Sequence, residues 1–201
     1  MTMVEERPVG GFAAARRSMI DSQLRVSGVN EDFVLAAMAR VAREEFVPEG
    51  AKATAYIDRA VALGGGRFIA APLFYGRLLG EAAPTAQDKV LIVDGGSGYL
   101  PALVGPLAGK VEVIDPAEAV AKTRKRGDFT LLLIDGAVEQ VPASLSVRLA
   151  DDARVVTGLV SRGVTRLARG RKAAGEIALL PLAEMGIPVL PEFAVEKGWT
   201  F

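Results

Sequence analysis

The residues best suited to chemistry form a glycine-rich turn directly after a short apolar run. Residues 90–93 read Val-Leu-Ile-Val, a composition typical of a strand buried on both faces of a parallel sheet. Five residues then supply a sharp turn before a predicted helix: Asp94, Gly95, Gly96, Ser97 and Gly98. Because free N–H groups and the helix dipole point into such a turn, this order of elements is the usual cradle for a nucleotide or nucleoside.

The spacing of the turn limits the ligand that it predicts. It reads G-G-S-G, and it has neither the G-x-G-x-x-G spacing of a dinucleotide site nor the G-K-[ST] of a P-loop. Phosphate is therefore not the expected ligand, and a tight turn that binds nothing is the alternative. Asp115 ends a second predicted strand, near the place where a βαβ nucleoside site puts an acid against ribose hydroxyls. For Asp115, a solvated strand-end carboxylate is the competing interpretation.

The composition excludes several kinds of chemistry. The 201 residues include no Cys and no His, which rules out disulfides, thiolate nucleophiles, Cys/His zinc sites and His-containing triads. Lys and Arg number 24 and so do Asp and Glu, so no overall basic field attracts nucleic acid. We expect no metal site and no nucleic-acid partner.

No run of apolar residues suggests a membrane or a signal peptide. None approaches the roughly 18–20 residues of a transmembrane span. Residues 1–17 are interrupted by Glu5, Glu6 and Pro8, unlike a signal peptide. We expect a cytoplasmic protein without a membrane partner.

Strands that alternate with helices must position the turn. Apolar residues at steps of three and four predict helices over 12–26 and 31–41, with Gly28 capping the first and Asn30 opening the second. We expect further helices at 72–79, 100–107, 116–126 and 141–149, strands at 110–115, 130–134, 154–160 and 176–182, a tightly approached or flexible glycine loop at 64–66, and a hairpin or turn region at 163–175. This order predicts an α/β fold with a mostly parallel sheet and antiparallel strands late in the chain.

Four short motifs occur in one order along the chain. They are R-R-S-M-I-D-S-Q-L at 16–24, V-A-R-E-E-F-V-P at 41–48, A-Y-I-D at 55–58 and D-G-G-S-G-Y at 94–99. Together they resemble the protein-L-isoaspartate O-methyltransferase family, whose enzymes use S-adenosylmethionine on a Rossmann-like fold. The resemblance covers nearly the whole chain. It implies one methyltransferase-like domain of residues 1–201, with an N-terminal helical part (1–50) and a Rossmann-like core (51–201).

The resemblance implies protein repair by methylation of isoaspartyl carboxylates, with isoaspartyl-containing proteins or peptides as partners. A sulfonium methyl group is already activated and a carboxylate is already a nucleophile, so the transfer needs mainly alignment and desolvation and little from His. The resemblance places S-adenosylmethionine against the turn, with Asp115 against the ribose and the acceptor beside the loop before Pro72. The cofactor-binding residues that it implies are Asp94, Gly95, Gly96, Ser97, Gly98 and Asp115. The substrate-binding residues that it implies are Tyr56, Arg67, Ile69, Ala70 and Pro72.

Two departures from the family pattern bear on activity. Where the family reads G-x-x-I-S-x-P, residues 66–72 read G-R-F-I-A-A-P, so Ala70 occupies the Ser position and the catalytic residue is unknown. Only residues 116–127 separate two strands where the family has a longer helix, another strand and the polar loop that contacts adenine. About one β-α unit is therefore expected to be missing. The edge strand lost with it would expose a pairing edge and favour a homodimer.

Three functions stay open at this point. The first is an isoaspartyl methyltransferase. The second, favoured by Ala70 and the missing unit, is a catalytically inactive, methyltransferase-like binding or interaction protein. The third is a methyltransferase with a changed acceptor, whose anion Arg67 recognises. For Arg67 an exposed loop cation is the simpler expectation.

Overall fold

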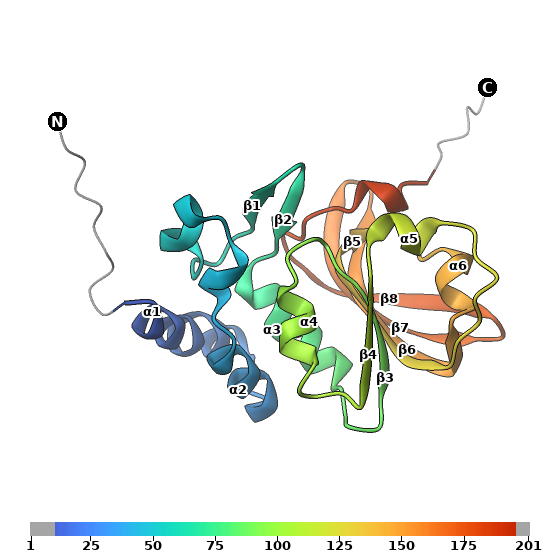
Figure 1. The fold of residues 1–201 in the computed structure, drawn as a ribbon, viewed down its shortest axis with the longest axis horizontal. Coiled ribbons are helices and arrows are strands. Elements are labelled where there is room, and N and C mark those ends of the chain that lie inside the picture. Colours follow the sequence, from blue (N-terminus) through green and yellow to red (C-terminus); the bar gives the residue numbers. More distant parts are fainter. Residues whose placement is uncertain (1–10, 196–201) are drawn as a thin grey trace.

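A six-stranded sheet in the order β4-β3-β5-β6-β7-β8 forms the centre of the molecule (Figure 1). The computed structural model describes residues 11–195. The strands are β3 (Lys89–Val93), β4 (Lys110–Ile114), β5 (Phe129–Val138), β6 (Leu149–Ser161), β7 (Val164–Ala173) and β8 (Glu176–Glu184). The pairs β3-β4, β3-β5 and β5-β6 are parallel, whereas β6-β7 and β7-β8 are antiparallel. The predicted mostly parallel α/β sheet with late antiparallel strands is confirmed.

Helices cover both faces of this sheet. They are α3 (Pro72–Ala82), α4 (Tyr99–Val104), α5 (Pro116–Val120), α6 (Ala143–Ser146) and the 3-10 turn η5 (Pro191–Phe193). Val90 and Ile92 of β3 belong to the apolar layer of α3 and α4, and Leu91 and Val93 belong to the layer of α5, α6 and η5. Neighbouring residues of a strand point to opposite faces, so both layers require apolar side chains. This is why residues 90–93 form a continuous apolar run.

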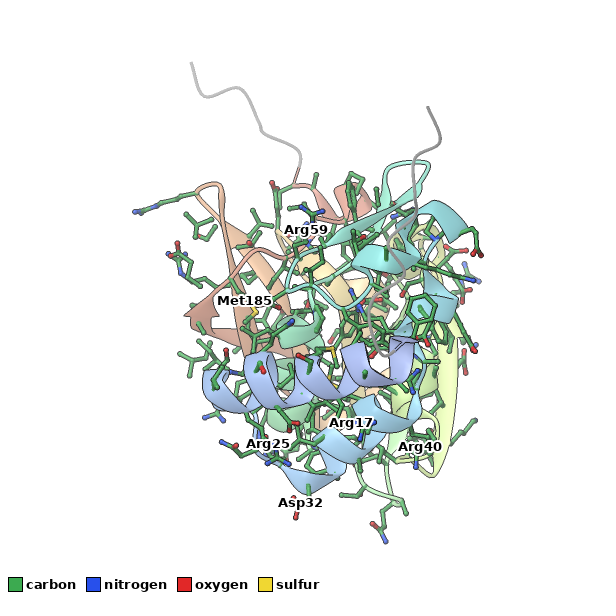
Figure 2. All side chains as sticks on the ribbon, turned by 90° about the vertical axis from the view of Figure 1, so that its left-hand side faces the viewer. Arg17, Arg25, Asp32, Arg40, Arg59 and Met185 are labelled. Atoms are coloured by element: carbon green, nitrogen blue, oxygen red, sulfur yellow. The ribbon has the colours of Figure 1, made fainter. Side chains whose placement is uncertain are left out.

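The N-terminal elements pack on the α3 and α4 side of the sheet (Figure 1). They are α1 (Gly11–Met19), the π-helical turn η1 (Ile20–Leu24), the 3-10 turn η2 (Arg25–Ser27), α2 (Asp32–Arg40) and the 3-10 turns η3 (Arg43–Phe46) and η4 (Glu49–Thr54). Figure 2 shows Arg17, Arg25 and Asp32 on the outer side of these helices. None of the helices within residues 11–195 has the length and hydropathy needed to cross a bilayer.

The first predicted helix is less regular than its apolar spacing suggests. The α-helix ends at Met19, and residues 20–27 continue as a π-helical and then a 3-10 turn. Gly28 caps this segment in the left-handed conformation with φ +81°, as predicted. The predicted cap of the next helix is wrong by one residue, because Glu31 and not Asn30 precedes α2.

The loop before α3 is an antiparallel hairpin of β1 (Val61–Gly64) and β2 (Arg67–Ile69). Its turn consists of Gly64, Gly65 and Gly66, whose φ angles of +94°, +57° and +78° favour glycine. The three glycines therefore serve a tight hairpin turn. Pro72 is the first residue of α3, as predicted.

Three predictions in the second half of the chain need correction. The helix predicted at 116–126 ends at Val120, because residues 121–128 form no regular element. The helix predicted at 141–149 shortens to α6. The hairpin or turn region predicted at 163–175 is the strand β7, which carries four basic residues and pairs antiparallel with β6 and β8, so the hairpin is confirmed and the turn is limited to its two ends. Gly170 lets β8 approach closely, since a Cβ there would lie 2.0 Å from the Ala178 carbonyl oxygen.

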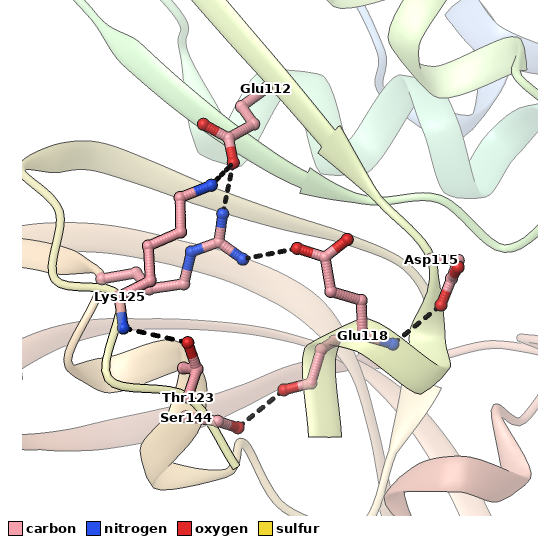
Figure 3. Close-up of polar contacts among 8 residues, drawn as sticks. Glu112, Asp115, Glu118, Thr123, Lys125 and Ser144 are labelled. Carbon is pink, nitrogen blue, oxygen red and sulfur yellow. Dashed lines mark hydrogen bonds and ion pairs between the residues drawn. The ribbon is translucent and has the colours of Figure 1, made fainter. Parts of the chain in front are cut away.

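The segment between β4 and β5 contains α5 and no strand, so β4 forms the edge of the described sheet. An ion-pair network fixes this segment (Figure 3). Glu112 of β4 lies 2.5 Å from Lys125 Nζ and 2.5 Å from the almost fully buried Arg148 guanidinium, which also lies 3.4 Å from Glu118. Hydrogen bonding to Lys125 lowers the pKa of Glu112. Charged side chains thus hold the short connection that replaces the expected β-α unit.

A fully buried arginine joins the N-terminal elements to the rest of the core. Arg43 Nε donates to the Ala55 carbonyl at 2.6 Å, and Arg43 Nη2 donates to the Ala70 carbonyl at 2.5 Å. Its guanidinium lies 5.6 Å from the ring centroid of Tyr75 and 5.2 Å from that of Tyr99. Arg43 therefore fixes η4, the loop before α3, and the helices α3 and α4 relative to one another.

We expect Arg43→Met to lower the free energy of unfolding by about 3 kcal/mol, because two buried carbonyl groups would each lose a partner worth about 1–3 kcal/mol. Urea denaturation measures this change. The matched control is Arg17→Met, at an exposed position on α1, which should stay within about 0.5 kcal/mol of wild type. Equal stability of the two variants would contradict the structural role of Arg43.

Candidate functional site

The candidate site lies at the carboxyl ends of β3 and β4, where two predicted carboxylates meet. Asp94 follows β3 and Asp115 follows β4, and the register pairs Val93 with Ile114. A cavity of about 360 Å³ lies there. Its lining consists of Arg67, Asp94, Gly96, Val113, Ile114, Asp115, Pro116 and Glu118. The structure thus brings together three of the predicted cofactor-binding residues and one predicted substrate-binding residue.

The glycine turn is held by the carboxylate of Asp94. This carboxylate accepts hydrogen bonds from the Gly96 N–H at 3.2 Å and the Gly98 N–H at 3.1 Å. Burial raises the pKa of Asp94, and the two N–H groups oppose that rise. Gly96 and Gly98 have φ angles of +106° and +71°, so the turn requires glycine at both positions.

Gly95 lets this turn pack directly against β5. A Cβ at this position would lie 2.4 Å from the backbone carbonyl oxygen of Asp135. No side chain fits in that space, so glycine is required by contact rather than by its φ angle. The Ser97 hydroxyl adds a second contact with β5, because it donates a hydrogen bond to Asp135 Oδ2 at 3.3 Å. The same hydroxyl accepts a hydrogen bond from the Tyr99 N–H at 3.1 Å.

Asp115 has a structural role at the edge of the cavity. Its Oδ1 accepts a hydrogen bond from the Glu118 N–H at 2.8 Å and so caps α5 (Figure 3). Within residues 11–195, no group donates to its second carboxylate oxygen, Oδ2. A ligand hydroxyl group at this cavity would therefore find an acceptor in Oδ2.

Arg67 is not the exposed loop cation of the simpler expectation. Its guanidinium forms a two-fold ion pair with Glu192 of η5, in which Nη1 lies 3.2 Å from Oε2 and Nη2 contacts Oε1. This pair lowers the pKa of Glu192. The Arg67 side chain also lies over the turn, since its Cγ is 3.4 Å from where a Cβ on Gly96 would be.

The other predicted substrate-binding residues are buried: Tyr56, Ile69, Ala70 and Pro72. The Tyr56 hydroxyl donates to Glu44 and accepts from Arg16 Nε at 2.7 Å, so it belongs to a structural ion-pair network. The Ala70 N–H donates to the Tyr75 hydroxyl at 3.2 Å. None of the four lines the 360 Å³ cavity, and their part in substrate binding stays a prediction.

A second, more apolar groove of about 490 Å³ lies on the other side of β2. Phe68 lines it, whereas the neighbouring Arg67 lines the first cavity, as expected for consecutive residues of a strand. Ala71 and Phe74 at the start of α3 and residues 185–189 complete much of its wall. The hairpin strand β2 therefore separates the two cavities.

Asp135 is a site residue that the sequence analysis did not select. It is 3% exposed, and burial, followed by the charge of Asp94, raises its pKa to about 7. Its Oδ1 has no hydrogen-bond partner within residues 11–195. Asp115, Asp94 and Asp135 lie near the carboxyl ends of the adjacent strands β4, β3 and β5, and this repeated pattern could have identified Asp135. No group of three or more acidic residues within 11–195 is arranged to hold a metal ion.

Comparisons with known proteins agree with the fold and the motifs. The sequence model of the protein-L-isoaspartate(D-aspartate) O-methyltransferase family matches residues 15–126. The protein-L-isoaspartate O-methyltransferase of Koribacter versatilis is 34% identical over 191 residues, which cover 83% of this chain and 86% of that protein. The enzyme of the same name from Roseiflexus sp. is 32% identical over 185 residues, which cover 80% of this chain and 84% of the relative.

Solved structures show the same architecture. The crystal structure of a Plasmodium falciparum protein, described as a protein-L-isoaspartate O-methyltransferase in complex with S-adenosyl-L-homocysteine, has a TM-score of 0.68 to this chain. The match covers 90% of this chain and 98% of that protein, at 17% sequence identity. At this level of identity the likeness establishes the Rossmann-like methyltransferase fold.

The raised pKa of Asp135 predicts a pH dependence of stability. The folded protein keeps this proton up to about pH 7, whereas the unfolded chain loses it above about pH 4. The free energy of unfolding should therefore fall between about pH 4 and pH 7 and stay level above that range. Asp135→Asn has no such proton, so between pH 5 and pH 8 wild type should lose on the order of 2 kcal/mol more than this variant.

Urea denaturation at pH 5, 6, 7 and 8 measures the two profiles. Asp32→Asn, at an exposed position of α2, serves as the control and should follow wild type. Parallel profiles for wild type and Asp135→Asn would show that Asp135 does not hold a proton in the folded protein near neutral pH.

Proposed function

Since this chain belongs to the protein-L-isoaspartate(D-aspartate) O-methyltransferase family, we propose that it transfers a methyl group from S-adenosylmethionine to isoaspartyl carboxylates of proteins. The observation that carries this proposal is that Asp94, Gly96 and Asp115, from the glycine turn and the next strand end, line one cavity. Family membership and this cavity favour the methyltransferase over the non-catalytic binding protein.

The cavity suits S-adenosylmethionine in size and charge. Its volume of about 360 Å³ lies within the usual range of small-molecule sites. Carboxylates of Asp94, Asp115 and Glu118 line it. They match a ligand that carries a sulfonium, an ammonium group and ribose hydroxyls, because carboxylates accept hydrogen bonds and attract cations. In this proposal, the backbone of Gly95, Ser97 and Gly98 forms the rest of the turn that contacts the donor.

The residues of this chain are proposed to bind and align the reactants rather than to transfer protons. The bound donor supplies an activated methyl group on its sulfonium. A new bond from a carboxylate oxygen to that methyl carbon replaces the sulfur–carbon bond, and S-adenosylhomocysteine leaves. No proton moves, so neither His nor a hydroxyl at position 70 is required. Both polar backbone groups of Ala70 are already bonded, to Tyr75 and Arg43.

We assign the polypeptide that flanks the isoaspartyl residue to the groove on the far side of β2, because the carboxylate itself must contact the methyl carbon in the donor cavity. A polypeptide is long and partly apolar, and this groove of about 490 Å³ is the larger and more apolar of the two cavities beside β2. Asp58 and Arg59 at its rim could pair with polar groups of the acceptor. In this assignment, Ile69, Ala70 and Pro72 shape the edge past which the isoaspartyl side chain reaches the donor, and Tyr56 supports that edge from the core.

We also propose that residues 1–201 act as one domain in the cytoplasm. The shared core supports the single domain, because Met19 and Met38 of the N-terminal elements belong to the same apolar layer as Val90 of the sheet. Cell fractionation tests the location.

The first experiment is calorimetric titration with S-adenosylhomocysteine. We expect a micromolar dissociation constant, about −8 kcal/mol, since the turn and Asp115 form a preorganised site. Asp115→Asn should weaken binding by at least about tenfold, because a charged acceptor for the ribose hydroxyls is lost. Asn still caps a helix, so α5 should be preserved in this variant.

An isoaspartyl peptide should then accept methyl groups from S-adenosylmethionine, whereas the matched aspartyl peptide should not. Wild type that gives no heat and no thermal shift with millimolar S-adenosylhomocysteine would overturn the enzymatic proposal. Binding without methylation of the isoaspartyl peptide would instead redirect the search to another acceptor.

The exposed edge of β4 supports a homodimer in which two copies pair their β4 strands. Val113 on β4 is 47% exposed. Light scattering after gel filtration should give twice the monomer mass. Val113→Lys should give a monomer, because like charges would meet at the interface, while Val147→Lys on the exposed end of α6 should leave the dimer intact. Val113 also lines the donor cavity, so the mass in solution, measured without ligand, is the readout. A monomeric wild type would overturn the dimer.

A further inference from the structure

The cavity beside the glycine turn contains one cation among several anions. Within residues 11–195, Arg67 is the one basic side chain that lines it, beside Asp94, Asp115 and Glu118. A donor with an amino-acid end brings a carboxylate as well as cationic groups. In this cavity, Arg67 is the lining side chain that can attract that carboxylate.

Glu192 already occupies the carboxylate-binding face of Arg67. Arg67 Nη1 contacts Glu192 Oε2 and Arg67 Nη2 contacts Glu192 Oε1, which is the two-pronged geometry in which arginine binds a carboxylate. Glu192 comes from the three-residue turn η5, 125 positions away in the chain, so this contact is tertiary. The Glu192 carboxylate also interacts unfavourably with the Asp115 charge, which raises the Glu192 pKa against the effect of Arg67.

The Arg67–Glu192 ion pair is partly buried and lies beside the glycine turn. The Arg67 stem lies over Gly96, and the Arg67 and Glu192 side chains are only 31% and 22% exposed. An ion pair shielded from water in this way is stronger than a surface pair. It closes β2 onto η5 beside the donor cavity, so a ligand carboxylate that reaches Arg67 must compete with Glu192.

We propose that Arg67 recognises the carboxylate at the amino-acid end of the methyl donor, and that Glu192 is its internal competitor, displaced when the donor binds. This inference rests on the proposed function, because it assigns a residue to the same donor site. Glu192 neutralises Arg67 while the donor is absent. Donor binding replaces one carboxylate with another on Arg67 and releases η5 from β2.

Two ligands and two variants test this inference. S-adenosylhomocysteine carries the amino-acid end, and 5′-methylthioadenosine lacks it. Arg67→Gln should weaken binding of S-adenosylhomocysteine at least about tenfold and leave binding of 5′-methylthioadenosine within about twofold. Glu192→Gln should tighten binding of S-adenosylhomocysteine several-fold, again without an effect on 5′-methylthioadenosine. Arg40→Gln, at an exposed position on α2, is the control for a lost positive charge.

The two variants break the same ion pair, so a merely structural role predicts changes in the same direction. Opposite changes in affinity for S-adenosylhomocysteine are expected only if the ligand competes with Glu192. Weaker binding by Glu192→Gln, or Arg67→Gln with unchanged affinity for S-adenosylhomocysteine, would overturn the inference and leave the proposed function intact. Wild type that binds neither ligand would overturn both.

Discussion

The buried guanidinium of Arg43 is the interaction on which the candidate site depends. A buried charge needs partners, and Arg43 finds them in two backbone carbonyls and two aromatic rings from different segments. One of those carbonyls belongs to Ala70, in the loop that continues from β2. The position of Arg67 over the glycine turn therefore depends on a core contact three residues away. The N-terminal elements thus hold the loop after β2 in place through Arg43, although none of their residues lines the 360 Å³ cavity.

The parallel sheet accounts for the chemistry of the site. Strands that run in one direction end at one edge, so Asp115, Asp94 and Asp135 meet there although the sequence separates them. Their environments then give them different states. Asp94 is held by backbone N–H groups, Asp115 caps a helix, and Asp135 is buried with a pKa of about 7. Three carboxylates of one type therefore act as a clamp for the turn's backbone, a helix cap and a buried acid with a raised pKa.

The sequence predicted the features that depend on local patterns. The strand at 90–93, the turn after it, Gly28 as a cap and Pro72 as a helix start follow from periodicity and backbone conformation, and the structure confirms them. It could not predict contacts between distant segments, such as Arg67 with Glu192. It left residues 163–175 as a hairpin or turn region, and only the pairing with β6 and β8 makes most of them the strand β7. Local propensity is overridden there by the hydrogen bonds of the sheet.

The short connection between β4 and β5 also explains why the Arg67–Glu192 pair can form. A full β-α unit would place more protein beside Asp115, whereas here α5 and η5 pack against each other at that end of the sheet. η5 can therefore bring Glu192 to Arg67, which lines the cavity. The charge that it adds must be balanced, and Arg67 balances it. The short connection thus leaves room for a C-terminal turn beside the candidate site, and the Arg67–Glu192 ion pair holds that turn to β2.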